Sequence, residues 1–373
     1  MKIKLITTIT ALVFLASIQT MAQKTLADAT KGKFLLGVAV NSQQVDGVNP
    51  IETELIAKEF SAIVPENCMK PQPIHPEENK YVWESADKLV AFGEKNKQVV
   101  TGHCLIWHSQ IGKWFFIDAD GKDVSPEVLK ERMHQHILTV VGRYKGRIKG
   151  WDVVNEAFED NGTYRNSKFY QILGKDFIKY AFQFAHEADP NVELYYNDYN
   201  VETPAKCDAI VQLVKELKAV GCRIDAVGSQ AHWHMNSPTV DATETSIKKL
   251  KDAGVKVLYT ELDISILPSP YDGANIAANF KYSKEMDPYK EGVPDSIQQK
   301  WNKRMLDMFG LFLKYNDVVD RVTLWGLTDN TTWLNNFPIR GRKDYPVLFD
   351  RNNKRKPVVN EMIKMAKKQK VKK

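Results

Sequence analysis

The chain has 373 residues, of which 43% are hydrophobic and 26% are charged, and its formal net charge is +6 at pH 7. This composition is typical of a folded protein with a sizeable core and excludes an intrinsically disordered chain. Most of the positive excess lies in the C-terminal stretch KMAKKQKVKK, and no basic stripe is interleaved with aromatic residues. We therefore expect no nucleic-acid partner and interpret the basic tail as a solvated helical end.

The N-terminal stretch has the features of an export signal. Two lysines precede an apolar run from Leu5 to Ile18, and the small residue Ala22 follows it. This arrangement is typical of a secretory signal peptide and is too short for an ordinary membrane span. The first cysteine is Cys68, so a cysteine-linked lipid anchor near the cleavage site is excluded. We predict a signal peptide at residues 1–22, a mature domain at 23–373, a periplasmic or secreted location, and no membrane span.

Four cysteines are too few for a disulfide framework in an exported chain of this size. Cys207 and Cys222 flank a predicted helix of about four turns, roughly 22 Å long, and this separation is too large for a disulfide. Cys68 and Cys104 fall near the ends of neighbouring predicted strands. The sequence leaves open whether they pair.

Short β-branched or aromatic runs alternate with helical patterns along the chain. Eight runs predict strands, at 34–40, 61–67, 98–107, 148–157, 192–199, 226–233, 255–264 and 321–329. The clearest helical patterns lie at 125–146, 169–189, 205–221 and 357–370. This alternation predicts an α/β protein with a parallel sheet, and eight is the number of units that closes into a (β/α)8 TIM barrel.

An open, doubly wound sheet is the alternative architecture. It would be favoured by a glycine-rich phosphate turn after the first strand, but GVAVNSQQVDG at 37–47 lacks the G-x-G-x-x-G spacing. No linker, internal repeat or low-complexity segment divides the chain, so we predict a single barrel. One long insertion, Ser265–Asp295, follows the seventh predicted strand, and long loops at this end of the fold commonly contact the substrate.

In a barrel of this type the active site lies where the strands end. The predicted strand ends carry many polar or aromatic side chains: Glu66, Asn67, Lys70, His103, Trp107, Asn155, Glu156, Asn197, Tyr199, Gln230, His232, His234, Glu261, Asp263 and Trp325. Two of these residues are glutamates that directly follow apolar runs, Glu156 after WDVVN and Glu261 after VKVLYT. We therefore expect two carboxylates to face one cavity.

Two carboxylates across a cavity suit hydrolysis of a glycosidic bond. One hands a proton to the leaving oxygen, and the other stays ionised to attack the anomeric carbon or to activate water. Either glutamate alone would fit a salt bridge or a helix cap, whereas both together favour catalysis. Trp107, Trp325 and Trp333 would pack on the C–H faces of sugar rings, while amide, lysine and imidazole groups would bind the hydroxyls.

A metal hydrolase is an alternative, because His232 and His234 have the spacing of metal ligands on one face of a strand. His103 and Asp263 are nominal further ligands. The neighbouring amide, lysine and tryptophan side chains suit a divalent cation poorly, so we expect no metal and no organic cofactor. We expect His232 to hold a catalytic carboxylate through a hydrogen bond.

Five motifs, in this order, resemble those of the family-ten glycoside hydrolases: PENCMK, TGHCLIWHSQ, WDVVNEAF, SQAHWH and YTELDIS. The typical member of this family is an endo-1,4-β-xylanase, and the resemblance runs from about Phe34 to the last helix. It implies a retaining double displacement on xylan or xylo-oligosaccharides, with Glu156 as the acid/base and Glu261 as the nucleophile.

The resemblance also implies roles for the surrounding residues. Asn155, Gln230 and His232 would surround the nucleophile and the sugar 2-hydroxyl, and Asp263 would support His232. Tyr199 would be a platform on the leaving-group side. The sugar subsites would be lined by Glu66, Asn67, Lys70, His103, Trp107, Gln110, Trp325 and Trp333.

Two positions depart from the family pattern. Pro71 stands where a tryptophan commonly follows the Met-Lys pair, and Cys68 stands where an acidic residue is frequent, so the contacts beside Lys70 stay open. Two rival functions also remain: a β-glucan or cellulose substrate, and a catalytically silent carbohydrate-binding protein, which the presence of both glutamates disfavours. We expect the protein to be a monomer.

Overall fold

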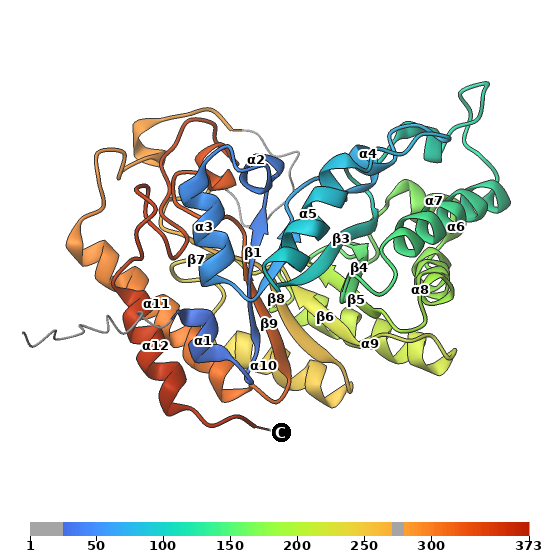
Figure 1. Ribbon diagram of the computed structural model, residues 1–373. Helices are drawn as coiled ribbons and strands as arrows, with labels where there is room; N and C mark the ends of the chain where they lie inside the picture. Colours follow the sequence, from blue (N-terminus) through green and yellow to red (C-terminus); the bar gives the residue numbers. More distant parts are fainter. Residues whose placement is uncertain (1–24, 271–279, 373) are drawn as a thin grey trace, which may run out of the picture.

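The computed structural model describes residues 25–270 and 280–372, where strands and helices alternate (Figure 1). The predicted signal peptide at 1–22 lies outside the described residues. The strands are β1 (Leu35–Val40), β2 (Ala62–Pro65), β3 (Val99–Trp107), β4 (Gly150–Asn155), β5 (Glu193–Asp198), β6 (Ala226–Ser229), β7 (His232–His234), β8 (Lys256–Ser265) and β9 (Val319–Leu324).

The helices that accompany these strands are of very unequal length. They are α1 (Leu26–Thr30), α2 (Ser42–Val45), α3 (Pro50–Glu59), α4 (Pro71–Ile74), α5 (Glu84–Lys95), α6 (Pro126–Arg143), α7 (Lys168–Leu173), α8 (Asp176–Ala188), α9 (Pro204–Ala219), α10 (Val240–Asp252), α11 (Asp295–Lys314) and α12 (Val358–Lys368). Three 3-10 turns complete the set: η1 (Lys113–Phe115), η2 (Lys284–Met286) and η3 (Trp333–Asn335).

The strands form a closed parallel barrel. Every strand pairing is parallel, and the order runs β6-β5-β4-β3-β2-β1-β9-β8. The pairing of β6 with β8 closes the sheet on itself, and the helices surround it (Figure 1). The predicted (β/α)8 architecture is therefore confirmed. Because all strands run the same way, their carboxyl ends lie on one rim.

The sixth predicted strand, 226–233, is divided in two. β6 ends at Ser229 and β7 begins at His232, because Ala231 between them has a φ of 59°, a left-handed backbone conformation that interrupts a strand. β7 then pairs with β8 alone, with His232 opposite Asp263. The interruption thus places a histidine of one strand beside the carboxylates of the next.

Two further elements differ from the sequence prediction. The helical pattern at 169–189 is split into α7 and α8 at Gly174, which has a φ of 60° that a continuous helix does not tolerate. The last strand ends at Leu324 rather than at residue 329, and a bend begins at Trp325, whose N–H still donates to the Leu262 carbonyl oxygen at 3.1 Å.

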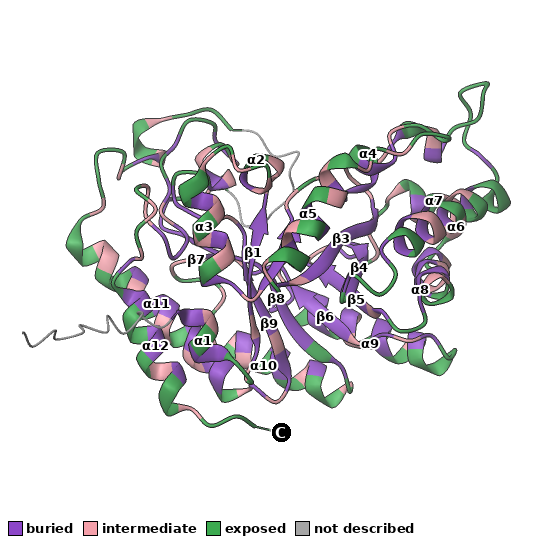
Figure 2. Ribbon diagram, viewed as in Figure 1, coloured by how far each residue is buried: buried purple, intermediate pink, exposed green. Residues whose placement is uncertain are grey.

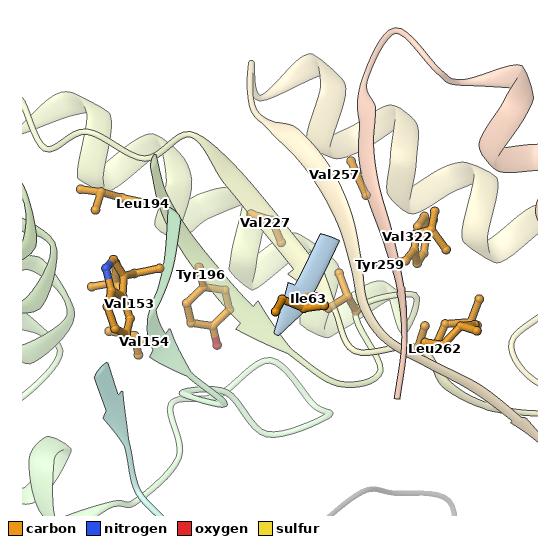
Figure 3. Packing of buried hydrophobic residues seen from close by; sticks show 14 of the residues in the cluster. Ile63, Val153, Val154, Leu194, Tyr196, Val227, Val257, Tyr259, Leu262 and Val322 are labelled. Atoms are coloured by element: carbon orange, nitrogen blue, oxygen red, sulfur yellow. The ribbon is translucent and has the colours of Figure 1, made fainter. Parts of the chain in front are cut away.

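The core lies between the barrel and its helices. Buried residues of β2, β4, β5, β6, β8 and β9 pack together in Figure 3, among them Ile63, Val153, Leu194 and Val227. Both faces of a parallel sheet are covered, which explains the nearly continuous apolar runs of these strands. Figure 2 shows the strands buried and the outward faces of the helices exposed, as expected for helices with one apolar stripe.

All four cysteines are free thiols, so Cys68 and Cys104, whose pairing the sequence left open, are not bonded.

Part of the insertion after β8, residues 271–279, lies outside the described residues. Arg342 donates hydrogen bonds to the carbonyl oxygens of Pro268 and Met286, at 2.9 and 3.4 Å, and so ties together the flanking segments. Among the described helices, none is both long and apolar enough to cross a membrane.

The packing predicts a large cost for truncating a core residue. Ile63 of β2 is 1% exposed, so Ile63→Ala should lower the free energy of unfolding by about 2–5 kcal/mol, because the substitution leaves a cavity. Urea denaturation would measure the loss. Ile51→Ala is the matched control, since Ile51 is 64% exposed and should change stability by no more than about 0.5 kcal/mol. Equal losses would contradict the position of Ile63 in the core.

Candidate active site

The carboxyl ends of the strands bring the two predicted glutamates into one polar site. Glu156 directly follows β4, and Glu261 lies in the second half of β8, which continues to Ser265. Both are buried, with 6% and 5% of their surface exposed. Asn155, Gln230 and His232 come from the ends of neighbouring strands and contact these two carboxyl groups.

Glu156 lies in surroundings that favour its protonated form. The indole Nε1 of Trp107 donates to its Oε2 at 3.0 Å, and the Gln230 amide donates to its Oε1 at 3.0 Å. Burial raises the pKa of Glu156, and the negative charges of Asp198 and Glu261 raise it further, outweighing the two hydrogen bonds. A carboxyl group that holds its proton more firmly than usual suits a general acid.

Glu261 has the opposite surroundings. Asn197 donates its amide N–H to Oε1 at 2.9 Å, and Nε2 of His232 lies 3.1 Å from Oε2. Burial alone raises the pKa of Glu261, but the hydrogen bond from His232 and the positive charges of His232 and Lys70 bring it below its ordinary value. Glu261 is therefore ionised at neutral pH, as a nucleophile must be.

A chain of two amides links the two carboxyl groups. Asn197 Nδ2 donates both to Glu261 and to Asn155 Oδ1, the latter at 2.9 Å, while Asn155 Nδ2 donates to Glu156 Oε1 at 3.3 Å. Thr260 donates to Asn197 Oδ1 at 2.7 Å and so fixes the orientation of the Asn197 amide. The two glutamates therefore face one site, and their pKa values are shifted in opposite directions.

His232 lies between two carboxylates. Its Nδ1 is 3.0 Å from Asp263 Oδ2, and its Nε2 contacts Glu261. Burial lowers the pKa of His232, but Asp263 and Glu261 raise it to about 10, so both ring nitrogens donate. Trp333 Nε1 also donates to Asp263, at 2.7 Å. This network fixes the position of the Glu261 carboxylate through His232.

The metal-hydrolase alternative finds little support in these contacts. Both ring nitrogens of His232 are directed at carboxylates, whereas a metal-binding histidine offers a neutral nitrogen to the metal. Within residues 25–270 and 280–372, no group of three or more His, Cys, Asp or Glu side chains could hold a metal ion. The absence of a metal requirement stays a prediction.

The predicted sugar-binding residues gather around the same rim. Lys70 Nζ donates to Asn67 Oδ1 at 3.0 Å and lies 5.2 Å from the ring centroid of Trp107 and 5.9 Å from that of Trp325. Trp333 stacks on Phe337 at a centroid distance of 4.5 Å. Two tryptophans from distant parts of the chain thus flank one lysine.

The remaining predicted residues contact their own neighbours. His103 Nδ1 lies 2.9 Å from Asp152, and its ring packs edge-on against Trp325. Glu66 accepts a hydrogen bond of 3.3 Å from Asn67, and burial raises the pKa of Glu66. Gln110 follows β3 with a φ of 46°, and its carbonyl oxygen accepts the Gln72 N–H at 2.7 Å.

Tyr199 is enclosed by two cationic side chains. It is 5% exposed, its hydroxyl accepts a hydrogen bond of 2.7 Å from Arg165, and the Lys206 ammonium lies 3.7 Å from its ring centroid. Its role as a platform stays a prediction.

Asn197 lies at a predicted strand end, but no role was predicted for it, and Asp198, Lys206 and Arg165 were not predicted as site residues. A signal for Asp198 exists, since YYND ends an apolar run on two polar residues. Lys206 gave no such signal, because a lysine in an amphipathic helix is ordinarily exposed.

The contacts of His232 predict an imidazolium ion at neutral pH. Its pKa in the folded protein, about 10, exceeds the ordinary value of 6.5, so its contribution to stability is complete below pH 6.5 and is lost as the pH rises through about 10. Nitrogen-15 NMR of histidine-labelled protein would follow both ring nitrogens. His108 is an internal control, since burial and the charge of Arg165 lower its pKa to about 4. A neutral His232 at pH 7 would contradict the prediction.

Comparison with known proteins agrees with this geometry. The model of glycosyl hydrolase family 10 matches residues 25–365. The chain is 52% identical over 345 residues to endo-1,4-β-xylanase A of Xylanibacter ruminicola, covering 92% of this chain and 94% of that protein. It is 39% identical over 327 residues to endo-1,4-β-xylanase B of Paenibacillus barcinonensis, covering 87% of this chain and 93% of that protein.

The solved structure of a family-10 endoxylanase from a sugarcane soil metagenome superposes with a TM-score of 0.89 at 47% identity, covering 91% of this chain and 99% of that one. The chain belongs to glycosyl hydrolase family 10.

Proposed function

We propose that this protein is a secreted, retaining endo-1,4-β-xylanase that cleaves internal β-1,4 bonds of xylan. The observation that carries the proposal is the pair of buried glutamates, Glu156 and Glu261, with pKa values shifted in opposite directions and a chain of amides between them. Relatives named endo-1,4-β-xylanases, over 87–92% of the chain, support the choice of substrate.

In the first step, Glu261 attacks the anomeric carbon and the bond from that carbon to the leaving oxygen breaks. Glu156 transfers its proton to the leaving oxygen, so a neutral sugar departs and a glycosyl ester remains on Glu261. In the second step, the ionised Glu156 takes a proton from water while the water oxygen attacks the anomeric carbon. The ester bond breaks, Glu261 is released as a carboxylate, and the configuration is retained.

The charge of Glu261 also explains how Glu156 changes its role between the steps. Burial contributes most to the raised pKa of Glu156 in the free enzyme, and the charge of Glu261 adds to it, which favours the protonated acid. Forming the ester removes the charge, so the pKa of Glu156 falls. The same side chain then serves as a base.

The rim residues would bind the sugar chain. Trp107, Trp325 and Trp333 offer apolar faces, and the polar groups around them offer hydrogen bonds to hydroxyls. The proposed sugar-binding set is Glu66, Asn67, Lys70, His103, Trp107, Gln110, Asn155, Tyr199, Gln230, His232, Trp325 and Trp333. Secretion rests on the signal peptide predicted at residues 1–22, and neither a partner protein nor a cofactor enters the proposal.

The first test compares substrates. We expect kcat/KM on xylan to exceed that on carboxymethylcellulose by at least about tenfold, because glucan rings carry an additional hydroxymethyl group that a site fitted to xylose excludes. Reducing-sugar release measures both rates, and proton NMR of the first products should show the β anomer. Faster hydrolysis of carboxymethylcellulose would indicate a glucanase. No hydrolysis of either would indicate a binding protein.

The second test separates the two glutamates. Glu156→Ala should lower kcat/KM on xylan by ~10²–10⁴-fold, because a sugar alkoxide leaves poorly without a proton. The first step on a dinitrophenyl β-xylobioside should be nearly unimpaired, since dinitrophenolate needs no acid. The second step lacks its base, so a burst of phenolate followed by slow turnover is expected.

Azide completes this test because it attacks without a base. Added azide should restore turnover of Glu156→Ala and give a β-glycosyl azide. An α-azide would show that Glu261 is not the covalent partner. If azide has no effect and the variant loses activity equally on xylan and on the dinitrophenyl β-xylobioside, Glu156 is not the acid/base.

A further inference from the structure

The backbone at Glu156 is in an unusual conformation. Its φ is 57°, a left-handed value that is uncommon for residues other than glycine and that the surroundings must stabilise. Three successive N–H groups are bonded to β5: Glu156 N to Asn197 O at 2.9 Å, Ala157 N to the Tyr196 hydroxyl at 3.0 Å, and Phe158 N to Asp198 Oδ2 at 3.4 Å. Strand β5 therefore holds the turn from which the Glu156 carboxyl group projects.

Asp198 is the central acceptor behind this turn. It is fully buried, and its Oδ1 accepts from the Lys206 ammonium at 2.8 Å and from Tyr199 N at 2.9 Å. Its Oδ2 accepts from Phe158 N and from the Tyr196 hydroxyl, the latter at 2.5 Å. Because the Tyr196 oxygen already accepts from Ala157, its proton points at Asp198. Both oxygens face donors, so the contacts fit an ionised carboxylate.

Lys206 supplies the positive charge that this carboxylate needs. The residue lies in the first turn of α9 and is fully buried. Its ammonium contacts Asp198, Asp160 at 3.3 Å, and the ring face of Tyr199. Burial raises the pKa of Asp198, and the charge of Lys206 is what most opposes that rise. Removing one partner of a buried ion pair leaves the other charge uncompensated, which is strongly unfavourable.

We propose that Lys206 is a positioning residue for Glu156: by keeping Asp198 ionised, it fixes the turn at residues 156–158 and so holds the acid/base carboxyl group toward the leaving oxygen. Without Lys206, Asp198 takes up a proton on Oδ1, the oxygen that has lost its ammonium partner, and the carboxyl group becomes neutral. Its Oδ2 then accepts weaker hydrogen bonds from the Phe158 N–H and the Tyr196 hydroxyl, because hydrogen bonds to an ionised acceptor are the stronger ones, and the turn relaxes. The proposal rests on the acid/base role of Glu156 given above.

The test compares two leaving groups in the full-length Lys206→Met variant. We expect kcat/KM on a xylo-oligosaccharide to fall by about tenfold or more, yet by less than in Glu156→Ala, because the acid remains but is misplaced. We expect kcat/KM on dinitrophenyl β-xylobioside to change by less than about twofold, since its first step needs no acid. A loss confined to the poor leaving group indicates impaired proton transfer, which general loosening of the fold does not produce.

Lys356→Met is the matched control. Lys356 is also a buried lysine, 6% exposed and 2.9 Å from Asp329. Its ammonium contacts Asp329, the carbonyl oxygen of Tyr345 and the ring of Trp301, none of which belongs to the turn at Glu156. It should lose stability and affect both substrates in the same proportion. The double variant Asp198→Asn, Lys206→Met provides for the case in which the single variant does not fold, because it leaves no unpaired buried charge. It should show the same leaving-group dependence, since the neutral asparagine amide lacks the negative charge that strengthens the hydrogen bonds from Phe158 and Tyr196.

Each outcome distinguishes this proposal from the proposed function. Equal losses on both substrates in the Lys206 variants, or no loss on either, would overturn the positioning role. If Glu156→Ala itself showed no dependence on the leaving group, the acid/base assignment would fail first. If Glu156→Ala shows that dependence and the Lys206 variants do not, the enzyme mechanism stands and only the inference about Lys206 fails.

Discussion

Burial destabilises a charged carboxylate, so two glutamates enclosed in one site both become neutral unless donors and cations are distributed unequally between them. The site distributes them in this way. Glu261 receives an amide donor and an imidazolium, and its pKa is lowered. Glu156 receives an indole and an amide but lies near the charges of Asp198 and Glu261, and its pKa is raised. The proposed double displacement depends on this difference.

Strand β5 serves both carboxyl groups because its side chains alternate. Asn197 reaches Glu261 and Asn155, whereas Tyr196 and Asp198, two residues apart and therefore on the same side of the strand, reach the turn after Glu156. The parallel barrel makes this possible. Strand β5 lies beside β4, and the carboxyl ends of these two strands are level, with Asn197 opposite Asn155. One strand thus donates a hydrogen bond to Glu261 and also holds the turn that carries Glu156.

The barrel and the two glutamates could be predicted from the sequence because their signals are local. Eight apolar runs alternate with helical patterns, and each glutamate follows its run directly. The division of the sixth strand could not be predicted, since a left-handed conformation at Ala231 is set by packing rather than by residue preference. The burial of Lys206 was hidden for a similar reason: its charge is compensated by Asp198 and Asp160, which only the tertiary fold brings to it.

Buried ion pairs are weak evidence for stability, because the loss of hydration roughly cancels the attraction between the charges. The pair formed by Lys206 and Asp198 is therefore better understood through the groups that it orients.

A left-handed residue other than glycine costs about 1–3 kcal/mol, and an ordinary hydrogen bond contributes about 0.5–1.5 kcal/mol. The three N–H bonds from residues 156–158 to β5 are together large enough to offset that cost. Two of the three end on Asp198 or on the tyrosine bonded to it. The unusual backbone at Glu156 and the fully buried lysine behind it thus belong to one arrangement, in which a buried charge pair holds the turn that carries the proposed acid/base.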